Sequence, residues 1–233
     1  MKHQSKLPMK HQSTLIFGTL LATICLFNLR AESPDSAGNI VINGGMEIWV
    51  PVKPYSGPNP EPIRPEGLEP EGFDTSMEVE GDQTVAVKIA PDKLFKHGGD
   101  YSVRIENTEQ EQTGDISLRE ISVEPNTKYM VRMWIKGEDI AVDKDPLHGA
   151  AIWVKYGPDQ DFWGSPSTKS EIKIPELREG SFPWTKFEFT FDTLPDTALL
   201  RVYLQLRKAT GKIWYDDLEV IPFGGKSVPV SNF

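Results

Sequence analysis

Residues 129–136 read Tyr-Met-Val-Arg-Met-Trp-Ile-Lys, and this stretch decides the fold. Apolar side chains occupy every second position from Tyr129 to Ile135, and Arg132, Trp134 and Lys136 occupy the alternate positions. A strand that packs one face on a core and turns the other to solvent shows this period of two. The stretch therefore predicts a half-buried antiparallel strand.

The same alternation recurs along the chain, between Gly, Pro, Asn and Asp residues that favour turns. No stretch after residue 31 shows a sustained helical period with caps. We therefore predict an all-β fold, an antiparallel β-sandwich formed by one domain at residues 38–222, with a tail at 223–233. The expected strands lie at 40–42, 85–89, 101–105, 115–123, 129–136, 150–156, 187–191, 201–207 and 212–221.

Three segments interrupt this pattern. Residues 50–72 are rich in Pro and Gly and are expected to form a long loop, or an arm over one end of the sandwich. Residues 136–147 and 157–168 are expected to be loops as well. Trp163, in the last of these, is expected either to pin its loop or to line the rim of a cleft.

Composition limits the function classes. The 233 residues are enough for a full hydrophobic core, and we expect a monomer. The net charge of −9 argues against a nucleic-acid partner, because phosphate binding needs a basic face. A single cysteine excludes a disulfide framework and a cysteine-based zinc site.

The N-terminus has the features of a signal peptide at residues 1–31. Lysines precede an uncharged run at 14–29, and Ala31 provides a cleavage site before Glu32. Cleavage there would remove four positive charges and no acid, taking the net charge from −9 to −13, and would remove Cys25. We expect a secreted or cell-envelope protein; the alternative is a retained membrane anchor.

Four sequence segments occur in a characteristic order along the chain. NGGMEIW at Asn43–Trp49 is followed by EISVEPNTKYMVRMWIKG at Glu120–Gly137, FPWTKFEFTF at Phe182–Phe191 and TGKIWYDDLEV at Thr210–Val220. Together they resemble the carbohydrate-binding modules of the CenC type, grouped with families 4, 9, 16 and 22. Met46 departs from the aromatic residue usual in the opening motif.

This resemblance implies a jelly-roll sandwich with galactose-binding-like topology that binds a polysaccharide or oligosaccharide. Such modules usually lie beside an enzyme domain. The sequence contains no recognisable enzyme domain, which leaves an enzyme on another chain as a partner.

The resemblance also implies a structural Ca²⁺ bound by Glu47 and Asp217, with Asp216 as a further ligand. Ca²⁺ binds roughly six to eight oxygens, and the turn at 96–100 is expected to supply carbonyl groups. Adjacent acids also repel each other unless a cation or a hydrogen bond neutralises them. The alternative is a bulge in which Asp216 and Asp217 face solvent.

Aromatic and basic side chains occupy the outward positions of three predicted strands, 129–136, 150–156 and 201–207. We expect these strands to be neighbours in one sheet, whose concave outward face stacks sugar rings on aromatic groups and bonds their hydroxyls. The alternative is that residues 50–72 cover this face and the aromatic residues are packing. The candidate ligand-binding residues are Arg132, Trp134, Trp153, Lys155, Arg201, Tyr203, Gln205 and Arg207.

Catalysis has little support in the sequence. Nucleophile and metalloprotease motifs such as G-x-S-x-G and H-E-x-x-H are absent. Glu188 is the one acid to test, and we expect it to pair with a cross-strand arginine instead. The leading hypothesis is non-catalytic carbohydrate binding. The alternatives are a small glycoside hydrolase or lyase, and a structural or adhesion protein of the envelope without sugar affinity.

Overall fold

A computed structural model describes residues 38–53, 63, 64, 66–79, 84–160, 166 and 168–223. The predicted signal peptide, Trp163 and residues 224–233 of the predicted tail lie outside the described residues. Among those that are described, no helix is long and apolar enough to cross a membrane.

Within these ranges the chain forms strands and turns, with no helix. Most strands coincide with alternating stretches of the sequence. They are β1 (Trp49–Pro51), β2 (Leu68–Pro70), β3 (Phe73–Glu78), β4 (Val87–Asp92), β5 (Ser102–Asn107), β6 (Thr113–Leu118), β7 (Ile121–Ser122), β8 (Lys128–Val142), β9 (Gly149–Gly157), β10 (Lys169–Lys173), β11 (Gly180–Asp192), β12 (Leu199–Arg207) and β13 (Ala209–Pro222).

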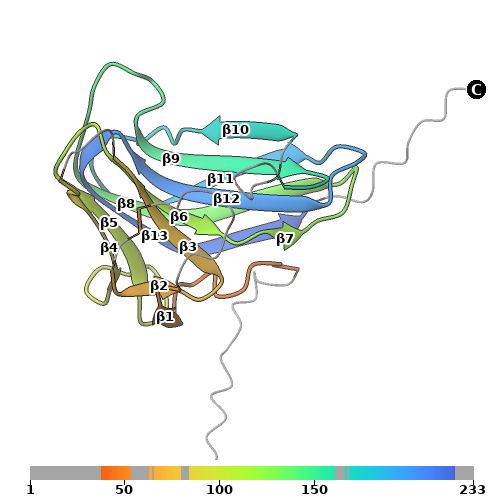
Figure 1. Cartoon of the computed structure of the whole chain (residues 1–233), viewed down its shortest axis with the longest axis horizontal. Coiled ribbons are helices and arrows are strands. Elements are labelled where there is room, and N and C mark those ends of the chain that lie inside the picture. Colours follow the sequence, from red (N-terminus) through yellow and green to blue (C-terminus); the bar gives the residue numbers. More distant parts are fainter. Residues whose placement is uncertain are drawn as a thin grey trace, which may run out of the picture. The chain divides into compact units, whose positions relative to one another are not determined.

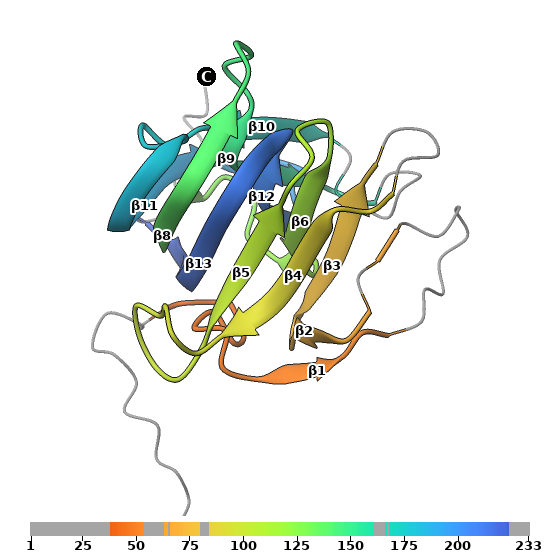
Figure 2. The same cartoon turned by 90° about the vertical axis from the view of Figure 1, so that its left-hand side faces the viewer.

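Two antiparallel sheets form the two layers of the molecule (Figures 1 and 2). The front sheet has the order β10-β9-β12-β6-β3, and β7 pairs with the end of β12. The back sheet has the order β11-β8-β13-β5-β4, and β1 and β2 form a separate two-stranded sheet. The prediction of an all-β, antiparallel sandwich is confirmed.

The core lies between the two sheets. Ile152 of β9 and Leu204 of β12 point inward from the front sheet, and Val131 and Ile135 of β8 point inward from the back sheet. Each exposes 1% of its surface or less. Full burial of such a side chain contributes about 1.5–3 kcal/mol, which explains why apolar residues take the inward positions of both layers.

Several element boundaries differ from the sequence-based expectation. β8 continues through the predicted loop to Val142, because residues 140–142 pair with β11 and β13. β1, β2, β3 and β10 were not expected, since each has six residues or fewer. Residues 40–42 form no strand, although the Ile40 amide donates to the carbonyl of Val220 over 3.0 Å.

The expectation that the three ligand-binding strands share a sheet is wrong for one of them. β9 and β12 are neighbours in the front sheet, whereas β8, which carries residues 129–136, lies between β11 and β13 in the back sheet (Figure 2). Arg132 and Trp134 therefore point outward on the opposite side of the sandwich. Alternation shows which face a side chain occupies but not which sheet its strand joins, and residues 143–148 connect the two sheets instead of closing a hairpin.

Candidate functional site

Two aromatic rings lie at the centre of the outward face of the front sheet. Trp153 on β9 and Tyr203 on β12 are directly opposite each other, and their ring centroids are 5.3 Å apart with a tilt of 35°. Both are partly exposed. The Trp153 indole donates to Ser170 Oγ of β10 over 2.6 Å, which fixes the orientation of its ring. We call this pair the aromatic platform.

Cationic side chains lie over the platform. Lys155 Nζ is 4.6 Å from the centroid of the Trp153 ring and 5.9 Å from that of Tyr203. The guanidinium carbon of Arg201 is 5.4 Å from the Tyr203 ring. Cation–π contacts of this kind hold flexible side chains beside a ring, so the platform combines apolar ring surface with hydrogen-bond donors.

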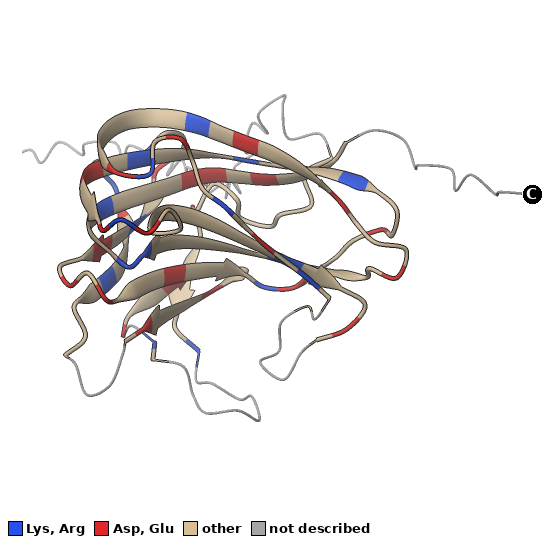
Figure 3. Cartoon of the chain, turned by 90° about the horizontal axis from the view of Figure 1, so that it is seen from above, with Lys and Arg blue, Asp and Glu red and all other residues tan. Residues whose placement is uncertain are grey.

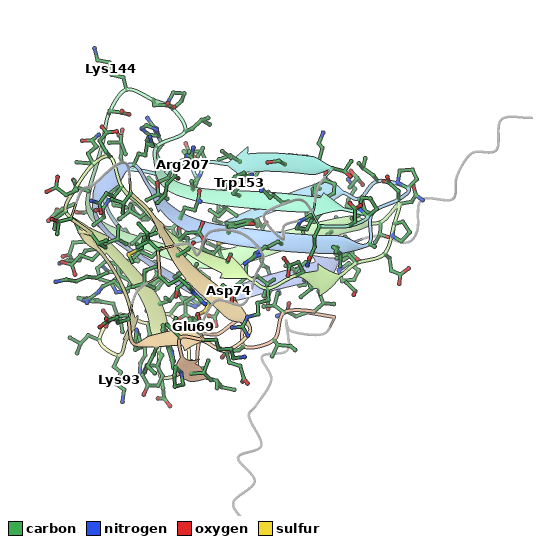
Figure 4. All side chains as sticks on the ribbon, viewed as in Figure 1. Glu69, Asp74, Lys93, Lys144, Trp153 and Arg207 are labelled. Atoms are coloured by element: carbon green, nitrogen blue, oxygen red, sulfur yellow. The ribbon has the colours of Figure 1, made fainter. Side chains whose placement is uncertain are left out.

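An ion-pair network runs from the platform to the β3 edge of the same face. Arg201 contacts Asp74 at 2.8 Å and Glu120 at 3.0 Å. Asp74 also accepts from Arg119 over 2.9 Å, and Arg119 reaches the fully buried Glu69 at 2.9 Å. Figure 4 shows Glu69 and Asp74 at this edge, and Figure 3 shows acidic and basic residues interspersed along the strands. The buried Glu69 and the partly exposed Asp74 and Glu120 hold these arginines in place.

A second cluster of polar side chains lies farther along β12, beyond Tyr203 of the platform. Asp115 of β6 faces Gln205 of β12 in the register, and the Gln205 amide donates to Asp115 Oδ2 over 2.7 Å. Asp115 is 7% exposed, and its burial raises the pKa of its carboxyl to about 7. Arg207 is the next outward residue of β12 and lies on the same sheet as Trp153 (Figure 4).

The structure thus brings together six of the eight candidate ligand-binding residues. Sequence reasoning missed Asp115 and Asp74, which complete the face from β6 and β3. Alternation placed residue 115 in a predicted strand, but the chain has 34 acids and nothing in the sequence singled this one out. The six residues on the face are Trp153, Lys155, Arg201, Tyr203, Gln205 and Arg207.

The other two candidates have different contacts on the back sheet. Arg132 forms an ion pair with Glu219 of β13. Trp134 stacks on His97, with ring centroids 3.8 Å apart. Glu188 of β11 lies opposite Arg132 and forms an ion pair with Lys186 at 3.0 Å. The Trp134–His97 contact holds the turn at 96–100 against the back sheet. The two ion pairs join residues within that sheet.

The Pro-rich segment lies partly outside the described residues. Its described parts form β1 and β2, which lie at one end of the sandwich (Figure 2), and Arg64, which bonds Glu69 beside β3. Residues 54–62, which the alternative places over this face, lie outside the described residues.

The opening and closing motifs meet in space. The Asn43 side chain accepts from the amides of Glu47 and Ile48, which closes the turn before β1. The amide of Leu218 in β13 donates to the carbonyl of Gly44 over 2.9 Å. A Cβ at position 44 would lie 2.0 Å from the Leu218 carbonyl oxygen, so this contact requires glycine.

The predicted calcium ligands also gather in one place, around the turn at 96–100. Both carboxylate oxygens of Glu47 accept from the Asp100 amide at 3.0 Å. Asp216 Oδ2 accepts from the His97 amide at 2.8 Å, and Asp217 Oδ2 is 2.7 Å from His97 Nδ1. Burial, with the neighbouring charge of Asp217, raises the pKa of the Asp216 carboxyl to about 7.

This arrangement does not fit a calcium ion as it stands. The turn presents N–H donors to the carboxylates, whereas Ca²⁺ requires oxygen ligands. Within the described ranges, no group of three or more His, Cys, Asp or Glu side chains is arranged to hold a metal ion. Calcium at Glu47, Asp216 and Asp217 stays a prediction.

A shallow pocket of roughly 350 Å³ lies elsewhere, beside the start of β13. Its lining includes Asn107, Glu138 and Lys212. The Lys212 ammonium donates to Glu138 over 2.9 Å, so these two charges are already matched. None of the candidate ligand-binding residues lines this pocket.

Known proteins resemble this chain in structure but not detectably in sequence. No protein-family model and no curated protein matches the sequence. The enzymatically active domain of tailspike protein 4 from bacteriophage CBA120 is similar with a TM-score of 0.50 and 12% identity, over 66% of this chain. This chain spans only 20% of that tailspike chain.

Other similar solved structures are mostly carbohydrate-binding modules. A CBM4 module has a TM-score of 0.46 and 16% identity, over 78% of this chain and 99% of its own. The CBM22-1 xylan-binding domain from Paenibacillus barcinonensis Xyn10C has a TM-score of 0.37 and 14% identity, over 66% of this chain and 88% of its own. Such low identities speak to the fold alone. The β-sandwich fold of this chain rests on its own two antiparallel sheets.

Proposed function

We propose that the outward face of the front sheet binds carbohydrate and that binding requires no covalent step. The observation that carries this proposal is the aromatic platform of Trp153 and Tyr203, partly exposed and flanked by Lys155, Arg201 and Gln205. A sugar ring has an apolar C–H face and a polar hydroxyl edge. An aromatic ring buries the first, while amide and guanidinium groups bond the second.

The size of the platform sets the expected affinity. Two rings and a few polar contacts bury far less surface than a standard protein interface, and part of the gain is lost in ordering the ligand. We therefore expect dissociation constants in the micromolar-to-millimolar range, which correspond to about −8 to −4 kcal/mol. Weak binding of this kind suits repeated contact along a polymer.

Secretion completes the proposal. The features of residues 1–31 support export to the cell envelope or the medium, where polysaccharides occur. An enzyme on a separate chain is the partner that this arrangement would serve, by being held near its polymer.

Affinity electrophoresis tests the function. Native gels containing β-glucan, xylan, mannan or alginate should retard the protein in at least one case. Trp153→Ala should abolish the retardation, while Trp134→Ala, which removes the same residue type from the opposite sheet, should leave it unchanged. Thermal unfolding shows whether each variant is folded. Folded wild-type protein that runs freely in every gel would contradict the proposal and favour a structural or adhesion role.

Cleavage of glycosidic bonds is a second candidate, favoured by Asp115. A carboxyl group with a pKa of about 7 on the ligand-facing side has the proton that a general acid needs. Release of reducing ends, or of unsaturated products from a lyase reaction, that disappears in Asp115→Asn would support this candidate. Unchanged release in that variant would exclude Asp115 from such a reaction.

A further inference from the structure

Buried polar atoms without hydrogen-bond partners adjoin the aromatic platform. In the described part of the chain they include Asp115 Oδ1, Gln205 Oε1 and Arg207 Nε. Asp115 and Gln205 expose only 7% and 3% of their surface, so solvent barely reaches them. Polar atoms buried in this way are normally hydrogen-bonded, and each unmet bond costs free energy. Three of them lie at adjoining positions, and a bound group that reached them once the side chains over them moved aside would restore those bonds.

The chemistry of these atoms limits the class of ligand that they can bind. Asp115, which donates when protonated and only accepts when ionised, and Gln205 Oε1, which accepts, both suit sugar hydroxyls, because a hydroxyl donates as well as accepts. Arg207 forms no ion pair with any described residue, whereas Arg201 is already paired with Asp74 and Glu120. A guanidinium fork bonds a carboxylate through two parallel hydrogen bonds, so Arg207 suits an anionic group.

The spacing fits one sugar ring. Gln205 and Arg207 are successive outward residues of β12, so their Cα atoms are roughly 6.6 Å apart along the strand. Arg207 is partly exposed, which leaves the patch open to solvent at that end. A ring whose diol meets Asp115 and Gln205 therefore places an acidic group on its far side near Arg207.

We propose that Asp115, Gln205 and Arg207 form a subsite for a uronic acid residue of an acidic polysaccharide. The sugar hydroxyls bond Asp115 and Gln205, its carboxylate pairs with Arg207, and a neighbouring sugar stacks on Trp153 and Tyr203. This inference rests on the proposed function, because it assigns the ligand class of the same face.

The charge balance of the face agrees with this ligand. Three arginines balance three acids in the ion-pair network, namely Arg64, Arg119 and Arg201 with Glu69, Asp74 and Glu120. Glu78 lies on β3 at the sheet edge, across from β6. Asp115 is neutral below its raised pKa of about 7 and then does not repel a uronate. Arg207 remains as a cation without a described counter-ion.

Isothermal titration tests the subsite with polygalacturonate and alginate, each beside its carboxyl-reduced form, at pH 6 and about 0.15 M salt. The reduced polymers keep the backbone and lose the charge. We expect at least one acidic polymer to bind about tenfold or more tightly than its reduced form, the effect of a charge-assisted bidentate contact. Arg207→Gln should remove this preference, and Gln205→Leu should weaken binding of the same polymer.

The control is Lys88→Gln, which removes one positive charge from an exposed position on the back sheet. It should keep the preference, and thermal unfolding should show all variants folded. Equal binding of acidic and reduced polymers, or a preference that survives Arg207→Gln, would overturn the uronate subsite and leave the proposed function intact. Dextran sulfate bound as tightly as the uronates would overturn it as well, because general anion attraction would then suffice. Failure of every neutral and acidic polymer to bind would overturn both proposals.

Discussion

Replacing Asp115 with asparagine should stabilise the protein, and the gain should grow with pH. The wild-type carboxyl bonds the Gln205 amide through one oxygen and leaves its other oxygen and Gln205 Oε1 without partners. A carboxamide at position 115 still accepts from the Gln205 amide and puts an N–H donor in place of the orphaned Oδ1. Asp115→Asn therefore removes one orphaned acceptor and the buried charge.

The magnitude follows from the raised pKa of Asp115. The folded state holds the proton up to pH about 7, against a reference value of 3.8 for an unperturbed carboxyl. A group whose folded pKa is raised stabilises the fold at low pH and loses that contribution as pH rises through the folded pKa. With about 1.4 kcal/mol per unit, the wild type should lose about 2–3 kcal/mol from this group between pH 5 and pH 8. The variant should lose none of it.

Urea unfolding at pH 5 and pH 8 measures this difference, and the comparison with wild type cancels the titration of other groups such as Asp216. Glu179→Gln removes an exposed acid outside the front sheet; it is the control and should change stability by less than about 0.5 kcal/mol at both pH values. The reasoning fails if Asp115→Asn destabilises the protein equally at both pH values, because Asp115 would then be an ordinary ionised partner of Gln205.

Three further predictions concern other parts of the account. Affinity for polygalacturonate should rise several-fold from pH 8 to pH 6 as Asp115 becomes neutral, and titrations in which Asp115→Asn keeps the full pH dependence would contradict this. Gly44→Ala should lower the free energy of unfolding by about 2 kcal/mol or more, because its Cβ meets the Leu218 carbonyl, and a urea midpoint equal to wild type would refute the contact. If Glu47 and Asp217 bind calcium, millimolar Ca²⁺ should raise the melting temperature above that in EDTA by several degrees, and Glu47→Gln should abolish the rise; identical melting curves would reject the calcium prediction.

The sequence predicted the architecture well, because burial imposes the alternation on every long strand. It did not predict the partners of those strands. Trp134 and Trp153 have the same outward position in strands of similar composition, yet they face opposite sides of the sandwich. Strand order in a two-layer fold depends on which connections cross from one sheet to the other. The alternation of apolar and polar residues within a strand does not indicate this.

The site was predicted in part for a related reason. Aromatic and basic residues on outward positions are unusual enough to notice, so Trp153 and Tyr203 were found. Asp115 was missed because one acid among 34 has no distinguishing neighbours in the sequence, and only the register that places it opposite Gln205 makes it special. The converging acids near residues 96–100 were predicted, but not the backbone N–H groups that bond them.

The central claim is that sugar binds to the front sheet, and the indole N–H signals of the six tryptophans test it most directly. In a titration with an oligosaccharide of the retarding polymer, NMR should show the Trp153 signal shifting while the Trp134 and Trp214 signals of the back sheet stay in place. Shifts confined to the back-sheet tryptophans would place the ligand on the wrong side of the sandwich and contradict the account.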